Sequence, residues 1–271
     1  MILFFLAAML PVICVHDCVT EGRKKLDEPK VESRINEASA TRSPWIISNG
    51  AKILRNPTGK YYYNFSSAHS AAMAVVESFV FAADAVVQIT GGETADAEKM
   101  KTFIASLPSS SLPPVVDLVV VDDGSDQTGE VMNLLVRRNL LFRPVKKADG
   151  SKFSVQIGTK DFPKLEAANP SDFAILVRKK LTDEKRSLRV YGSENVIARL
   201  DSDGKTARLH VLNYGQRPVE GIRIRVRGVY KNAAMQAFGI PNAKVEEMLV
   251  DGDSTEFSIT ELRQYAVVDL R

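Results

Sequence analysis

The sequence predicts a mainly parallel, layered α/β domain followed by a C-terminal antiparallel β-sandwich. Val115–Val121 is a short apolar run rich in β-branched residues, which is typical of a strand covered on both faces of a sheet. An acidic turn, a segment with helical spacing and a second apolar run follow it up to Val145. That order is a βαβ unit and predicts a parallel sheet. From Arg186 onward the hydrophobic period is two almost throughout, which predicts short antiparallel strands.

Length and composition limit the domain count and the classes of partner. A chain of 271 residues accommodates one large domain or two ordinary ones. The net charge of +3 is small, so composition gives no argument for a nucleic-acid partner, and we expect none. We also expect no cofactor. The partners that we expect are a carbohydrate or another protein.

The first residues resemble a targeting segment rather than part of a domain. Met1–Val15 is nearly uncharged; it is too short to span a bilayer but suits the core of a signal peptide. We therefore expect residues 1–20 to be a signal peptide, the mature protein to be secreted or periplasmic, and no stable membrane span to remain after signal removal. The alternative is an incorrectly assigned start or an N-terminal segment that is buried in the fold. Residues 21–44 are polar and charge-dense, which predicts a linker.

The two cysteines give no argument for a metal site. Cys14 and Cys18 lie at the edge of the predicted leader with His16 between them. A structural zinc ion needs four ligands, and the chain has no second cysteine pair. We therefore expect no metal centre.

The predicted α/β domain comprises residues 45–183. Within it we expect a long, apolar and largely buried helix over 68–87, and a second helix over 95–106. Pro170 suits the first turn of a helix that continues to about Leu181. The predicted strands are Ala51–Arg55, Tyr61–Phe65, Val115–Val121, Leu140–Val145 and Phe153–Gly158.

The predicted β-sandwich comprises residues 186–271. Asp201–Gly204 is a hairpin turn signal, because Gly204 readily adopts positive φ. His210 alternates with Leu209 and Val211, so we expect its side chain to point away from the sandwich core. The predicted strands are Leu188–Tyr191, Val196–Leu200, Ala207–Tyr214, Val219–Tyr230, Lys244–Val250, Thr255–Ile259 and Ala266–Leu270.

The most suggestive polar residues directly follow the strand that ends at Val121. Asp122, Asp123, Ser125 and Asp126 stand where open α/β sheets place their ligands, at the carboxyl end of a parallel strand. They are our candidate ligand-binding residues. The alternative is structural, because the same residue types end strands, cap helices and complement the positive N-terminus of a helix.

The string Val119–Asp126 resembles the nucleotide-binding turn of GT-A glycosyltransferases of the polysaccharide-synthase-like group. In that family the carboxylates hold the base and the ribose, and a later Asp-x-Asp holds the metal and the diphosphate. Asp201 and Asp203 superficially supply that second element. However, the family's opening strand is missing upstream, and this Asp-x-Asp lies in a predicted hairpin turn. Export would also separate such an enzyme from cytosolic sugar nucleotides.

A second candidate surface comes from a row of arginines. Arg223, Arg225 and Arg227 alternate with Ile222, Ile224 and Val226, so their side chains lie on one face of one strand. Such a stripe suits an anionic partner. The alternative is a solvated outer face whose arginines pair with carboxylates across the sheet.

The string Arg208–Tyr214, followed by Gly215–Val226, resembles the β-sandwich that ends many bacterial glycoside hydrolases. In the family 42 β-galactosidases a comparable short β domain follows an amidotransferase-like α/β trimerisation domain. The same order occurs here from about Trp45 to the end of the chain. The chain has no room for that family's catalytic barrel, so the resemblance implies an accessory or oligomerisation role without glycosidase chemistry.

These observations favour an exported, non-catalytic module that binds carbohydrate or a protein partner. Two alternatives remain. One is a GT-A-like, nucleotide-sugar-dependent glycosyltransferase that uses Asp122 and Asp123 together with Asp201 and Asp203. The other is a degenerate hydrolase whose site lies near the carboxyl ends of the parallel strands.

Overall fold

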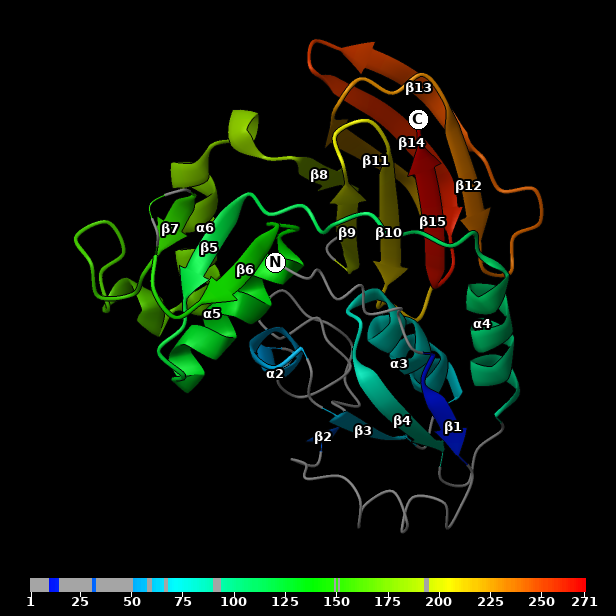
Figure 1. Cartoon of the computed structure of the whole chain (residues 1–271), viewed down its shortest axis with the longest axis horizontal. Helices are drawn as coiled ribbons and strands as arrows, with labels where there is room; N and C mark the ends of the chain where they lie inside the picture. The colour runs from blue at the N-terminus through cyan, green and yellow to red at the C-terminus, as the bar shows by residue number, and fades with distance from the viewer. Residues whose placement is uncertain are drawn as a thin grey trace. The chain divides into compact units, whose positions relative to one another are not determined.

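The fold is an α/β domain followed by an antiparallel β-sandwich, as the sequence predicts. A computed structural model describes residues 10–14, 31–32, 51–57, 60–65, 68–89, 94–148, 150, 152–192 and 195–271. Most of the predicted signal peptide and almost all of the predicted linker lie outside these residues. The described residues form two compact units, the first ending at Ser111 and the second beginning at Leu112 (Figure 1). Whether 45–183 and 186–271 fold as separate domains stays a prediction.

The first unit is built on a four-stranded, fully parallel sheet with the strand order β1-β4-β3-β2. Helix α3 is apolar nearly all round, and its residues from Ala71 to Ser78 are buried. On β3, the Tyr63 hydroxyl donates to Glu77 Oε1 of α3 over 3.0 Å, so strand and helix also share a buried polar contact. The elements of this unit are β1 (Val12–Cys14), β2 (Val31–Glu32), α2 (Ala51–Arg55), β3 (Lys60–Phe65), α3 (Ala68–Val80), β4 (Asp84–Ile89) and α4 (Ala95–Ser106).

Two predictions within the first unit are wrong. The strand predicted at Ala51–Arg55 is the short helix α2. The helix predicted over 68–87 ends at Val80, and residues 84–87 belong to the strand β4. Ala82 takes the left-handed conformation, with φ of 52°, and turns the chain between the two elements. Alternate residues of β4 are buried, but small and apolar residues without a breaker hide this period of two in the sequence.

The second unit starts with a three-stranded parallel sheet of order β6-β5-β7. The predicted βαβ unit is present, because β5 leads through α5 into its parallel neighbour β6. The Phe162 ring packs 5.7 Å from that of Phe173, measured between centroids. The elements are β5 (Leu118–Val121), α5 (Asp126–Arg137), β6 (Phe142–Val145), β7 (Phe153–Val155), α6 (Pro170–Leu181) and two 3₁₀ turns, η1 (Glu166–Ala168) and η2 (Asp183–Lys185).

The sandwich consists of two four-stranded antiparallel sheets, β12-β15-β10-β9 and β13-β14-β11-β8 (Figure 1). Every strand predicted in this part is present, and the structure adds β12, which the sequence analysis missed. The strands are β8 (Leu188–Tyr191), β9 (Val196–Ser202), β10 (Ala207–Asn213), β11 (Val219–Arg227), β12 (Ala233–Ala237), β13 (Val245–Asp251), β14 (Ser254–Leu262) and β15 (Tyr265–Leu270).

The sandwich core is filled by the apolar residues that alternate along each strand. In β11, Ile222, Ile224 and Val226 are fully buried, and Phe257 and Ile259 of the neighbouring strand β14 are buried beside them on the same face of the sheet. Burying each such side chain contributes roughly 1.5–3 kcal/mol. Because the side-chain period is two, this burial fixes which residues of β11 point outward.

Backbone pairing joins the parallel sheet to the sandwich within the second unit. The segment before β5 runs antiparallel to β9: the Val115 amide donates to the Leu200 carbonyl over 2.9 Å, and the Ser202 amide donates to the Pro113 carbonyl over 2.8 Å. Just after α5, the side chain of Asn139 makes two hydrogen bonds to β9. Its Nδ2 donates to the Val196 carbonyl over 3.1 Å, and its Oδ1 accepts from the Ala198 amide over 2.7 Å. The α/β part and the sandwich therefore share one hydrogen-bond network.

A third link holds the connector that precedes β8. Asp117, which directly precedes β5, accepts from the Ser187 amide over 2.9 Å and from the Ser187 hydroxyl over 2.5 Å. Burial raises the pKa of Asp117, while the two Ser187 hydrogen bonds act in the opposite direction. This carboxylate, lying within the apolar run Val115–Val121, therefore has a structural partner 70 residues away in the sequence.

The role of Asn139 is testable. Asn139 is buried and has φ of 53°; the exposed Asn242 has φ of 54° and serves as a matched control for the backbone conformation. We expect Asn242→Ala to cost about 1 kcal/mol of unfolding free energy, because alanine disfavours positive φ. Asn139→Ala should cost about 3 kcal/mol, because it also leaves two backbone groups of β9 without partners. Urea denaturation measures both, and equal losses would show that the Asn139 side chain does not hold the two parts together.

Candidate functional site

The acidic turn after β5 is held by its own hydrogen bonds. Asp122 Oδ1 accepts from the Gly124 amide over 3.0 Å, and Gly124 has φ of 79°. Asp123 Oδ1 accepts from the Ser125 amide over 2.9 Å and from the Ser125 hydroxyl over 2.7 Å. These Ser125 bonds hold the pKa of Asp123 below its usual range. The turn is therefore a rigid pair of side-chain-to-backbone turns.

The same turn starts α5. Ser125 Oγ accepts from the Thr128 amide over 3.2 Å, which is the capping bond of a helix N-terminus. Asp126 lies in the first helical turn, where a negative charge is favourable. Of the four candidate residues, Asp122 is almost buried, whereas Asp123 is exposed. Their contacts account for the local structure, and a role in ligand binding stays a prediction.

The structure does not bring the second acidic pair to this turn. Asp201 is paired with Pro114, which precedes β5, whereas Asp122 follows β5. The two acidic pairs therefore lie at opposite ends of that strand. Asp203 occupies the β9–β10 hairpin, where its Oδ1 accepts from the amides of Lys205 and Thr206 over 2.9 Å and 2.8 Å.

Among the described residues, no group of three or more histidine, cysteine, aspartate or glutamate side chains is placed to hold a metal ion. Cys18 and His16 lie outside that part of the chain. No helix in the described ranges is long and apolar enough to cross a membrane.

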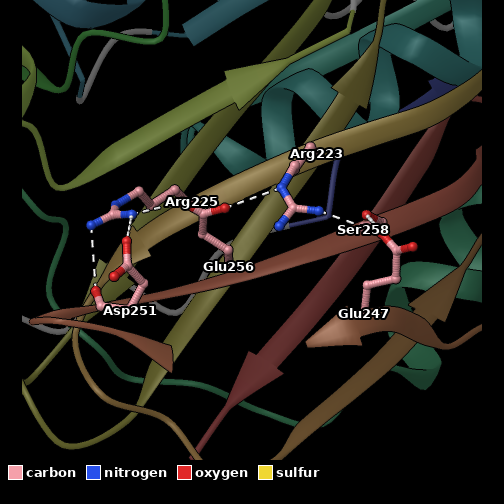
Figure 2. A network of polar contacts seen from close by, with 6 residues as sticks. All are labelled: Arg223, Arg225, Glu247, Asp251, Glu256 and Ser258. Carbon is pink, nitrogen blue, oxygen red and sulfur yellow. Dashed lines mark hydrogen bonds and ion pairs between the residues drawn. The ribbon is translucent and has the colours of Figure 1, made fainter. Parts of the chain in front are cut away.

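The arginine row forms an ion-pair network on the outer face of the sheet β13-β14-β11-β8. Figure 2 shows Arg223 and Arg225 on either side of Glu256. Arg223 Nε lies 3.0 Å from Glu256 Oε2, and one terminal nitrogen of Arg225 lies 2.7 Å from Glu256 Oε1. That same Arg225 nitrogen is 2.7 Å from an Asp251 carboxylate oxygen. Arg227 Nε lies 3.3 Å from an Asp253 oxygen, so all three arginines have carboxylate partners.

The ion pairs of this network shift the pKa values of the side chains that form it. The hydrogen bonds to Asp251 and Glu256 raise the pKa of Arg225, and the Arg225 hydrogen bond is the main reason why the pKa of Glu256 is lowered. Exposed single ion pairs contribute little to stability, but linked pairs with short contacts restrict one another's rotamers. The outer face of the sandwich therefore presents side chains in fixed positions.

A β-bulge adds one residue to this surface that the sequence analysis missed. The register between β13 and β14 shifts between Glu246 and Leu249. Within the bulge, Glu247 has φ of 50°, and its Oε2 accepts from Ser258 Oγ over 3.0 Å and lies 3.4 Å from a terminal nitrogen of Arg223 (Figure 2). The carboxylates of Asp251, Asp253 and Glu256 were missed as partners as well. In the sequence, the only signal for these partners is the presence of opposite charges on predicted neighbouring strands. That signal identifies a pair only when the register between the strands is known.

On the other sheet, His210 points away from the sandwich core, as predicted. Its Nδ1 lies 2.7 Å from the Tyr265 hydroxyl, and its Nε2 lies 3.5 Å from an Asp201 carboxylate oxygen. The imidazole and phenol rings are nearly parallel, with centroids 6.1 Å apart. His210 is only 5% exposed, and this burial lowers its pKa although Asp201 acts to raise it.

The comparisons with known proteins bear on the fold. No protein-family model matches the sequence, and no curated protein sequence matches it either. Among solved structures, α-L-fucosidase isoenzyme 2 from Paenibacillus thiaminolyticus aligns with a TM-score of 0.60 at 8% identity, over 80% of this chain and 61% of that one. The fold of this chain therefore resembles part of the fucosidase fold. At that identity the likeness concerns the fold alone, and the chain spans less than two thirds of the fucosidase.

Two further solved structures align less well. The exo-carrageenase GH42 from Bacteroides ovatus has a TM-score of 0.32 at 6% identity, over 80% of this chain and 42% of that one. An α-amylase from H. orenii has a TM-score of 0.21 at 10% identity, over 93% of this chain and 55% of that one. Neither score is high enough to support an argument about this chain.

The burial of His210 predicts a pH dependence of stability. Because its folded-state pKa lies below the unfolded value of about 6.5, the unfolded chain takes up the proton first as the pH falls. The free energy of unfolding should therefore fall below about pH 6.5, by roughly 1 kcal/mol per pH unit. Around His210, Arg199 and Arg208 also oppose its protonation, while Asp201 favours it.

Urea denaturation at pH 7.0 and 5.5 measures this effect. In His210→Gln the loss between the two values should be clearly smaller than in the unaltered protein. His16 and His69 are present in both proteins, so their contribution cancels in the comparison. Equal losses in the two proteins would assign the effect to other groups.

Proposed function

We propose that this chain is an exported, non-catalytic module, related to the accessory domains of glycoside hydrolases, that binds carbohydrate or a protein partner. The observation that carries the proposal is the ordered arginine–carboxylate network on the outer face of a sandwich with a glycoside-hydrolase-like fold. Holding exposed long side chains in fixed rotamers costs conformational entropy. A surface whose side chains are already ordered loses less entropy when it binds a ligand.

The geometry of the acidic turn supports the non-catalytic part of the proposal. Asp122 and Asp123 each direct one carboxylate oxygen at a neighbouring amide, and Asp203 does the same in its own hairpin. A GT-A-like site needs the two acidic pairs at one place, whereas here they lie at opposite ends of β5. Capping and turn formation account for these residues without a reaction.

Export rests on the apolar N-terminal run, and the edge position of β1 is compatible with cleavage of that run. The strand β1, Val12–Cys14, falls inside the predicted signal peptide and pairs with β4. It is an edge strand of its sheet, so its removal by cleavage leaves the pairing of β4 with β3 and of β3 with β2 in place. If no cleavage occurs, β1 is part of the fold, which is the alternative that the sequence already offers.

The non-catalytic part is tested by calorimetry with UDP-glucose and Mn²⁺. We expect no saturable heat, because the carboxylates that would hold the nucleotide and the metal are engaged and far apart along β5. Micromolar binding that is lost in Asp122→Asn and in Asp203→Asn, but kept in the control Asp161→Asn, would overturn the proposal. Asp161 is exposed, and its carboxylate forms an ion pair with Lys180. Its substitution therefore controls for loss of charge alone.

Export is tested by expression in a secreting host. We expect mass spectrometry of the extracytoplasmic product to show a chain that lacks roughly its first 20 residues. A Leu3→Arg, Leu6→Arg variant interrupts the apolar run with two charges and should stay in the cytoplasm. An unaltered chain recovered in soluble form from the cytoplasm with Met1 intact would contradict export.

A further inference from the structure

One row of side chains crosses the outer face of the sheet β13-β14-β11-β8 and ends at an exposed aromatic ring. Tyr191 of β8 stands directly opposite Arg223 of β11, and Arg223 stands opposite Ser258 of β14. On the far side of Ser258, Glu247 reaches the row from the β13 bulge. Three strand spacings separate the two ends, a distance of about 14 Å. Tyr191 is 41% exposed, one of the few large hydrophobic residues with such exposure in the described part of the chain.

The three arginines of β11 already have carboxylate partners. The three guanidinium groups of Arg223, Arg225 and Arg227 meet four carboxylates, those of Glu247, Asp251, Asp253 and Glu256. An anionic ligand would have to displace these carboxylates from their arginines. An uncharged polyhydroxyl ligand would not, because each hydroxyl group both donates to a carboxylate and accepts from a guanidinium.

The side chains that bond to one another leave polar atoms directed at solvent. Glu247 uses Oε2 for both of its contacts, with Arg223 and Ser258, and its side chain is 70% exposed. The bulge costs free energy, because a non-glycine residue at positive φ is strained by about 1 kcal/mol or more. Bulges commonly re-aim a side chain next to a functional site. This one adds a carboxylate to the row.

The composition of the face favours carbohydrate over protein as the ligand. The centre of a protein–protein interface is depleted of charged residues, whereas the centre of this face is a set of paired charges. An aromatic ring beside planar polar side chains offers a sugar one apolar surface and several hydrogen-bond partners.

We propose that Tyr191, Arg223, Glu247 and Ser258 form a binding site for an uncharged oligosaccharide on the outer face of the sandwich. The Tyr191 ring packs on the apolar face of one sugar ring, and Arg223 and Glu247 bond to hydroxyl groups further along the ligand. This assignment rests on the proposed function and selects its carbohydrate alternative.

The experiment is calorimetry of the full chain with maltoheptaose, cellopentaose and xylopentaose, with dextran sulfate as the anionic probe. We expect at least one neutral oligosaccharide to bind with a Kd of about 10–1,000 μM. Its affinity should be about the same at 50 mM and 500 mM NaCl, because no net charge is neutralised. Tyr191→Ala and Glu247→Gln should each weaken binding about tenfold, whereas Tyr191→Trp should retain it.

The matched control is Glu261→Gln, because the Glu261–Arg263 pair is an exposed ion pair outside the row. Neutral oligosaccharide binding that Tyr191→Ala and Glu247→Gln leave unchanged would overturn the site and leave the proposed function standing. Salt-sensitive binding of dextran sulfate alone would overturn the uncharged ligand. Binding of none of the four probes would overturn the carbohydrate assignment and leave the protein-partner alternative of the proposed function. Tyr191 and Glu247 are exposed, so circular dichroism should show all variants folded.

Discussion

The burial of one face of β11 is the constraint on which the sandwich and its outer surface both depend. The core between the two sheets contains Ile222, Ile224 and Val226. The arginines that alternate with them must therefore point to the outer face of the sheet. A shift of one residue in this register would place three guanidinium groups in an apolar core, at a cost far beyond the stability of a domain. Core packing therefore places the arginines on the outer face, and this placement does not depend on their ion pairs.

The hydrogen bonds at β9 have a similar role for the second unit as a whole. A sandwich sheet usually ends in an edge strand with unpaired backbone groups, which invites pairing with other chains. Here the segment before β5 and the Asn139 side chain occupy part of that edge. The α/β part is therefore attached by directional bonds in addition to apolar contact. That explains why the parallel sheet from β5 to β7 belongs to the same compact unit as the sandwich.

Much of the fold was predictable because local patterns decide it. The helices Ala95–Ser106 and Pro170–Leu181 have the predicted bounds, since the pair Gly91-Gly92 precedes the first and Pro170 starts the second. The misread segment, from 81 to 89, contains no glycine or proline, and its turn depends on Ala82 at positive φ, which composition does not reveal. The strand β12 was missed because its alternation, Ala233–Ala237, involves mostly small residues.

The candidate surface was half predictable for a different reason. The shared face of Arg223, Arg225 and Arg227 follows from a period of two within one strand. Their partners come from β13 and β14, and they depend on pairing register and on a bulge, which a single sequence does not specify. For the acidic turn, the sequence analysis named the residues. Their hydrogen bonds to neighbouring amides depend on the backbone conformation, which only the structure gives.

The bulge at Glu247 has a further consequence, which concerns self-association. The strand β13 lies at the edge of its sheet, where a straight strand would offer a ladder of amides and carbonyls to a second copy of the chain. An interrupted register with a left-handed residue breaks that ladder midway, and the charged residues Glu246 and Glu247 lie at the break. The irregularity that adds a carboxylate to the outer face thus also makes this edge a poor template for aggregation into extended sheets.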